Sequence, residues 1–90
     1  MIKHFNIHIY GRVQGVHYRV SAVEVANNLG IKGFARNEKN ESVYIEAEGE
    51  ENSLSQFVDW CRKGPSRAKV ELVEVNEDEM KNYTTFAIQR

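Results

Sequence analysis

The sequence predicts a two-layer α+β fold in which two helices cover one face of an antiparallel sheet. Two observations support this prediction. Short segments alternate apolar and polar residues at a period of two, whereas two longer segments repeat apolar residues at helical spacing. In chain order the segments read strand, helix, strand, strand, helix, strand, with a short strand at the end. Two helices cannot cover both faces of such a sheet, so the ferredoxin-like βαββαβ sandwich is the economical arrangement.

The first half of the chain supplies a strand and a helix. Phe5, Ile7 and Ile9 alternate with polar residues, which is typical of a strand with one buried face. A loop bounded by glycines follows this strand. Residues 18–29 then place apolar side chains at helical spacing, and Gly30 is a suitable residue to end the helix.

The second half repeats the pattern with an additional strand. Residues 31–37 and 43–48 are expected to form strands joined by a polar turn. Asn52 or Ser53 is expected to cap the second helix, which a Gly-Pro pair ends. The apolar stripe of this helix consists of Leu54, Phe57, Val58 and Cys61.

Two alternating runs of opposite phase follow the second helix. Ala68, Val70 and Leu72 form the first run, and Val73 and Val75 form the second. A change of phase within one strand indicates a bulge or a strong twist. A polar connector, residues 76–85, then leads into a short final strand near the C-terminus.

Length and composition are those of one small globular domain over residues 1–90. The only cysteine, Cys61, excludes an internal disulfide and is expected in the core. No continuous hydrophobic segment indicates a signal peptide or a membrane span, so we expect a cytoplasmic protein with no membrane partner.

The charges are segregated along the chain. The net charge is −1, which argues against a general nucleic-acid binder. The first 36 residues nevertheless carry five cations and one acid, and the remainder carries seven cations and twelve acids. The N-terminal part is therefore expected to attract a small anion.

The segment GRVQGVHYR, residues 11–19, lies between the first strand and the first helix. Gly11 and Gly15 would allow backbone N–H groups to turn around an anion at the helix N-terminus, and Arg19 could clamp phosphate oxygens. An ordinary turn with a solvated arginine is the alternative. The segment matches neither a Walker A loop nor a cysteine-phosphatase loop, since no cysteine precedes Arg19.

Several segments resemble one known family. Residues 11–19 resemble the acylphosphatase signature G-x-V-Q-G-V-x-(F/Y)-R at every specified position. GFARN, residues 33–37, resembles the second motif of that family, and SVYIEAEG, GPSRAKVELVEV and TFAIQ resemble later segments in the same order. The resemblance implies a ferredoxin-like hydrolase that cleaves carboxyl-phosphate anhydrides to carboxylate and phosphate.

The resemblance also implies roles for single residues. Arg19 would bind the phosphate, and Asn37 would orient the attacking water. The backbone of the loop would form the phosphate cradle through Gln14, Gly15, Val16, His17, Tyr18 and Arg19. This scheme requires no metal and no cofactor. His17 could serve as a base, but we favour a peripheral position for its ring.

One residue departs from the family pattern. The family has a glycine in the hairpin after the asparagine, and Glu41 occupies that position here. Asn40 could adopt the left-handed conformation instead. The departure puts the hairpin geometry in question but removes no chemical group from the proposed site.

Other interpretations stay open. His4 and His8 share a strand face, where we favour an open sheet surface over a metal site. An RNA-binding module has the same strand order, but Glu46 and Glu48 beside Tyr44 would repel phosphates. A phosphate-sensing protein without turnover is a further alternative. We expect a monomer that binds a small acyl phosphate or inorganic phosphate and no nucleic acid.

Overall fold

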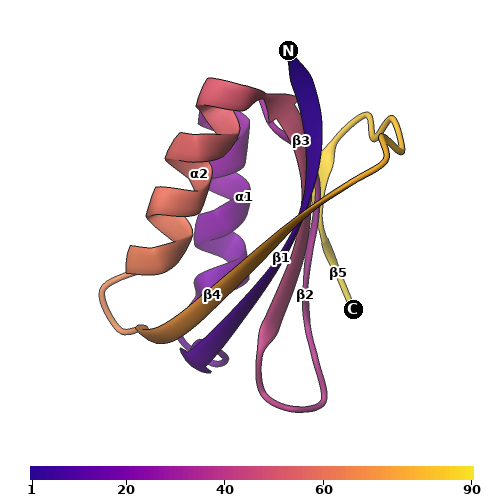
Figure 1. Cartoon of the computed structure of the whole chain (residues 1–90). Coiled ribbons are helices and arrows are strands. Elements are labelled where there is room, and N and C mark those ends of the chain that lie inside the picture. Colours follow the sequence, from indigo (N-terminus) through magenta and orange to yellow (C-terminus); the bar gives the residue numbers. More distant parts are fainter.

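Two helices lie side by side on one face of a five-stranded sheet in the computed structural model, which describes residues 1–90 (Figure 1). The strands are β1 (Ile2–Arg12), β2 (Lys32–Asn37), β3 (Val43–Glu50), β4 (Lys69–Asp78) and β5 (Phe86–Gln89). The helices are α1 (Tyr18–Leu29) and α2 (Glu51–Lys63). The first helix spans the range that the sequence predicts, and β4 continues three residues into the predicted connector. The ferredoxin-like prediction is confirmed. No helix combines the length and apolar character needed to cross a bilayer.

The sheet has the order β4-β1-β3-β2-β5. The first four strands pair antiparallel, as predicted, but β5 pairs parallel to β2. The antiparallel prediction is therefore confirmed for the first four strands, and the short extra strand adds a parallel pair at this edge. After β4 the chain crosses the sheet and returns in the opposite direction (Figure 1). On the far edge this return places β5 beside β2, which also runs opposite to β4.

The core lies between the helices and the inner face of the sheet. Helix α1 buries Tyr18, Ala22 and Ala26 there, whereas α2 buries the apolar stripe predicted from the sequence, with Cys61 fully enclosed. Burial raises the pKa of the Cys61 thiol to about 12 and keeps it protonated at neutral pH. Trp60 is a packing residue at the edge of this core, with ring centroids 5.1 Å from Tyr18 and 6.1 Å from Phe57.

Strand β4 contains the bulge that its apolar pattern indicates. Tyr10 of β1 faces Leu72, but Gly11 faces Val70, so Glu71 is an additional residue in β4. The extra residue explains why Val70 and the later valines pack on the core while Leu72 is exposed. Gly11 has a φ of 132°, and a Cβ there would collide with the backbone of β4. Its role is therefore close strand approach, and it lies within β1 rather than among residues 14–20, whose N–H groups are free.

Helix α2 begins directly after β3, without a side-chain cap. The prediction of Asn52 or Ser53 as the N-cap is wrong, because Glu50 holds that position in an extended conformation. The carbonyl oxygen of Met1 accepts the N–H of Glu51 at 3.1 Å and satisfies a donor that a cap would otherwise bind.

The connector between β4 and β5 covers part of the sheet face opposite the helices (Figure 1). The Glu48 carboxylate accepts hydrogen bonds from the backbone N–H groups of Lys81 and Tyr83. His4 lies beneath this segment with 1% of its surface exposed, so the prediction of an open position for it is wrong. His8 remains partly exposed, with its ring centroid 4.6 Å from that of Tyr44.

Candidate active site

The loop that connects β1 to α1, residues 13–17, is anchored by two buried valines, Val13 and Val16. Between and after them, Gly15 and His17 are exposed and have φ values of 73° and 62°. Positive φ is easy for glycine but strained for histidine. These two left-handed residues turn the chain just before the first turn of α1. The loop therefore has a defined conformation, held by its buried valines.

Backbone donors gather in this loop. The N–H groups of residues 14–20 donate no hydrogen bond to the protein backbone, and the first bond of the helix runs from Ser21 N to His17 O at 3.0 Å. Free N–H groups at a helix N-terminus carry the positive end of the helix dipole. The first turn of α1 contains no acidic residue to neutralise it. The arrangement can therefore bind an anion such as a phosphate.

Arg19 lies in that first helical turn and is half-buried. It takes part in none of the ion pairs of the molecule, in contrast to Arg36, which pairs with Glu38 at 2.8 Å. No carboxylate competes for the Arg19 guanidinium, so its planar set of donors remains free to bind phosphate oxygens in a bidentate manner.

Asn37 is the last residue of β2 and is exposed. Ala35, two residues earlier, is fully buried in the core, so strand alternation places the Asn37 side chain on the helix-covered face. Strands β1 and β2 are both antiparallel to β3, and their C-terminal ends therefore lie at the same end of the sheet. This places the loop that starts α1 and Asn37 at one end of the molecule.

Gln14 connects the two parts directly. Its Nε2 donates to the carbonyl oxygens of Glu38 and Ser42, at 2.9 Å each. Its side chain thus binds the hairpin after Asn37 and is turned away from the loop donors, while its backbone N–H remains among them. Sequence reasoning placed Gln14 only in the cradle. The local signal was limited to a polar residue between two buried valines.

Comparisons with known proteins agree with this geometry. A sequence model of the family described as acylphosphatase matches residues 5–88. The chain belongs to the acylphosphatase family. An acylphosphatase of Ligilactobacillus salivarius is 40% identical over 97% of this chain and 98% of that protein. An acylphosphatase of Thermotoga maritima is 41% identical over 98% of both chains.

Solved acylphosphatases also share the fold. The crystal structure of the acylphosphatase from Bacillus subtilis superposes with a TM-score of 0.95 at 32% identity and covers the whole of both chains. The structure of an acylphosphatase from Coxiella burnetii gives the same TM-score at 28% identity, over 98% of this chain and 93% of that one. The family resemblance that the motifs indicate is therefore confirmed along the chain.

The hairpin after Asn37 shows how this chain accommodates its departure from the family pattern. Glu41 itself adopts the left-handed conformation, with a φ of 70°, so the prediction that Asn40 would do so is wrong. Asn40 instead accepts a hydrogen bond from the backbone N–H of Ser42 at 3.2 Å through its side chain. The turn is closed by Glu38 N to Ser42 O at 2.9 Å and Glu41 N to Glu38 O at 3.1 Å. The turn geometry is preserved, and the glutamate bears the strain.

The side chains of Tyr18 and His17, at the end of the loop, differ in their surroundings. Tyr18 is buried, and its hydroxyl donates to the Cys61 carbonyl oxygen at 2.7 Å. Burial holds the pKa of Tyr18 far above its ordinary value of 10. The phenol therefore anchors the start of the helix and does not act as an acid in catalysis. The His17 side chain is exposed and forms no hydrogen bond.

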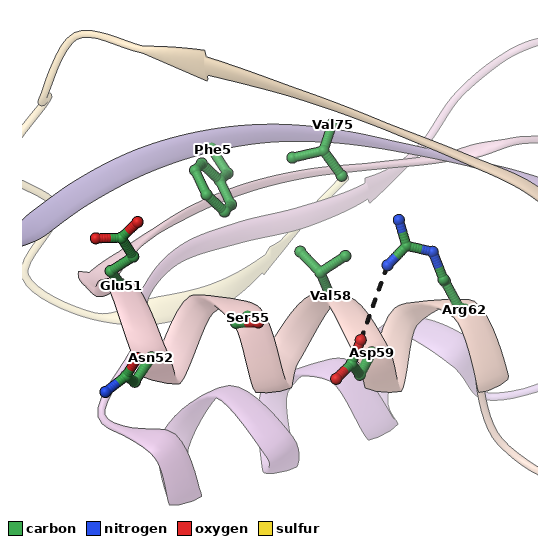
Figure 2. A pocket seen from close by; sticks show the side chains of 8 residues that line it. All are labelled: Phe5, Glu51, Asn52, Ser55, Val58, Asp59, Arg62 and Val75. Carbon is green, nitrogen blue, oxygen red and sulfur yellow. Dashed lines mark ion pairs between the residues drawn. The ribbon is translucent and has the colours of Figure 1, made fainter.

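The largest cavity of the molecule lies away from the loop, between α2 and the β1–β4 edge (Figure 2). It has a volume of about 430 Å³ and is lined by Phe5, Glu51, Asn52, Ser55, Val58, Asp59, Arg62 and Val75. An ion pair of 3.9 Å joins Asp59 to Arg62 across its floor (Figure 2). Neither Arg19 nor Asn37 contributes to it. The residues of the candidate site line none of the three cavities, so its location follows from chemistry and not from cavity size.

Proposed function

We propose that this chain hydrolyses small acyl phosphates to a carboxylate and inorganic phosphate, with Arg19 and Asn37 as its catalytic residues. The observation that carries the proposal is the group of free N–H donors in residues 14–20 beside an arginine that pairs with no carboxylate. Asn37 lies at the same end of the sheet. Membership of the acylphosphatase family supplies the reaction class.

The loop and Arg19 bind the phosphoryl group of the substrate. Backbone N–H groups and the helix dipole meet part of its negative charge, and the Arg19 guanidinium meets the rest. Phosphoryl transfer depends mainly on charge stabilisation and in-line positioning. Fixed backbone donors suit this task because they need no reorganisation as charge develops.

Asn37 orients the attacking water. An amide side chain can both accept from and donate to water, but it cannot take a proton at neutral pH. The oxygen of the water forms a bond to phosphorus while the bond from phosphorus to the acyl oxygen breaks and its electron pair leaves on the carboxylate. One proton of the water passes to a phosphoryl oxygen of the substrate, and the other stays on the oxygen that has bonded to phosphorus. The leaving carboxylate is already a stable anion, so no general acid is needed.

The remaining parts of the proposal concern partners. The chain works as a single monomeric domain in the cytoplasm, without metal or cofactor and without nucleic acid. The surroundings of Tyr44 argue against an RNA-binding surface. Its side chain is 9% exposed, and its hydroxyl donates a hydrogen bond to the Glu46 carboxylate at 2.7 Å. The Arg36 side chain lies over the Tyr44 ring, 4.9 Å from its centroid. An aromatic side chain held in this way is not free to stack on a base.

Hydrolysis of benzoyl phosphate tests the proposal, because loss of the aromatic acyl phosphate changes the ultraviolet absorbance. We expect turnover well above a buffer blank in the presence of a chelator, with competitive inhibition by inorganic phosphate. Phosphate binding without hydrolysis would contradict the proposal and favour the sensing alternative. A shift of single-stranded RNA at low salt would contradict the exclusion of nucleic acid.

A further inference from the structure

The contact between Gln14 and the hairpin carries a function of its own. The last pair of the β2–β3 ladder is Asn37 with Val43. Glu38 and Ser42 form the next pair beyond it, and Gln14 Nε2 donates to both of their carbonyl oxygens at 2.9 Å. The Gln14 side chain thus binds both members of the pair that directly follows Asn37, the residue proposed to hold water.

The chemistry of the amide fixes which end of Gln14 makes this contact. Two carbonyl oxygens can be met only by an NH₂ group, because the amide oxygen would repel them. The residue is itself held in place, since the neighbouring Val13 is 1% exposed. Both ends of the connection are therefore defined, one by burial and the other by a pair of hydrogen bonds.

Asn37 depends on such support. Its side chain is exposed and forms no hydrogen bond within the protein, so its position follows from the backbone alone. The hairpin behind it contains Glu41 at a φ of 70°, a conformation that costs free energy in a residue with a side chain and persists only where the surrounding contacts hold it. A misplacement of about 1 Å in a positioned group can reduce the rate on the order of a hundredfold.

We infer that Gln14 is a positioning residue that fixes Asn37 relative to the phosphate-binding loop, an inference that rests on the proposed function. The loop binds the phosphoryl group, and Gln14 sets the distance from that group to the water that Asn37 holds. Loss of the amide therefore impairs the attack of water and leaves the binding of phosphate intact.

The test uses Gln14→Met, which keeps the length of the side chain but removes its donors. We expect kcat for benzoyl phosphate to fall at least about tenfold, while the inhibition constant of inorganic phosphate changes less than about twofold. Gln56→Met, at an exposed position on α2, is the matched control and should leave both constants unchanged.

A double variant separates positioning from simple stabilisation. If Gln14 acts through Asn37, then adding Gln14→Met to Asn37→Ala lowers kcat no further than Asn37→Ala alone. Independent, multiplying losses would overturn the inference, as would an unchanged kcat in Gln14→Met. A parallel loss of phosphate affinity would also overturn it, because Gln14 would then be a phosphate ligand.

The inference can fail separately from the proposed function. If the unmodified protein does not hydrolyse benzoyl phosphate, the proposed function fails, and amide NMR of Gln14→Met then decides the contact. Shifted signals and faster hydrogen exchange at Glu38 and Asn37 would support the connection between the loop and the hairpin. Unchanged signals there would overturn it.

Discussion

The two ends of the sheet differ in whether their polar groups have hydrogen-bond partners within the protein. At the end that holds the β2–β3 hairpin, the N–H groups of residues 14–20 and the Arg19 guanidinium have no protein partner. At the other end, beneath the connector, the side chains of His4, Glu46 and Glu48 are buried and hydrogen-bonded. No buried side-chain nitrogen or oxygen in the molecule lacks a partner.

The difference indicates what each end is for. Satisfied polar groups rigidify a structure and offer nothing to a ligand, whereas fixed but free donors are preorganised to bind one. Substitutions of the Arg19 and Asn37 side chains at the donor-rich end should therefore change activity with little effect on stability. Substitutions at the satisfied end should do the reverse.

The largest expected effect is that of Arg19→Gln. Loss of a charge and two donors to the phosphoryl group should lower kcat/KM by at least about 3–4 kcal/mol, on the order of a hundred- to a thousandfold. The melting temperature should hardly move, because Arg19 pairs with no carboxylate. Steady-state kinetics and thermal unfolding would measure both. Arg67→Gln, at an exposed position, is the control, and near-normal turnover in Arg19→Gln would break the comparison.

Asn37→Ala should abolish most turnover while leaving the binding of inorganic phosphate largely intact. The amide is proposed to orient water and does not contact the phosphoryl group, so kcat should fall by on the order of a hundredfold. Calorimetric titration with phosphate would measure the binding part. Asn28→Ala on the exposed side of α1 is the control. Equal losses of kcat and phosphate affinity would assign Asn37 to binding instead.

At the satisfied end, Glu48→Gln should destabilise the fold by about 1–3 kcal/mol without lowering kcat. The Glu48 carboxylate accepts from Tyr83 N at 3.0 Å and contacts His4 Nδ1 at 2.7 Å. An amide can replace only part of these acceptors, and the connector should loosen. Urea denaturation would measure the change. A variant as stable as the unmodified protein would show that the connector is held by other contacts.

Acid should lower the stability contributed by Glu48, at the end of the sheet beneath the connector. Burial alone would raise the pKa of Glu48, but hydrogen bonds from Lys81, His4 and Tyr83 outweigh it and lower the pKa below its ordinary value of 4.5. A carboxylate with a lowered pKa stabilises the fold above pH 4.5 and loses that contribution as the pH falls through its folded pKa. The melting temperature should therefore drop less between pH 5 and pH 3 in Glu48→Gln than in the unmodified protein. A drop of equal size in both would contradict this.

The smallest effect is a gain. Glu41→Gly should stabilise the protein by about 0.5–1 kcal/mol, because a left-handed residue with a side chain costs about 1–2 kcal/mol and glycine avoids most of this. Glu79→Gly, at an exposed connector position without a positive φ, should give no gain. Thermal unfolding of the two variants would measure the contrast. A loss of stability in Glu41→Gly would show that the glutamate makes a compensating contact.

The sequence predicts whatever depends on local pattern. Alternation and helical spacing locate the strands and both helices, and the phase change between Leu72 and Val73 reveals the bulge at Glu71. Contacts between residues far apart in the chain cannot be predicted from such patterns. The two contacts of Gln14 reach 24 and 28 residues along the chain, and that of His4 with Glu48 reaches 44. No local periodicity encodes them.

The same limit applies to conformation at single residues. The absence of the family glycine at position 41 predicts an unusual hairpin, but whether Asn40 or Glu41 adopts the positive φ does not depend on local sequence pattern. The register of Ser42 against Glu38 decides this, and that register is set by the β2–β3 ladder as a whole. Likewise, the parallel pairing of β5 follows from where the connector crosses the sheet.

Gly11 bears on how signature motifs are used to search sequences. It opens the segment GRVQGVHYR, yet it serves the close approach of β1 to the bulge of β4. A single signature thus contains residues with two unrelated roles. Gly11 serves the packing of an edge strand, and residues 14–19 serve the binding of an anion. A chain that keeps residues 14–19 but carries a larger residue at position 11 should therefore be scored as a protein with a different sheet edge, not as one that has lost the chemistry.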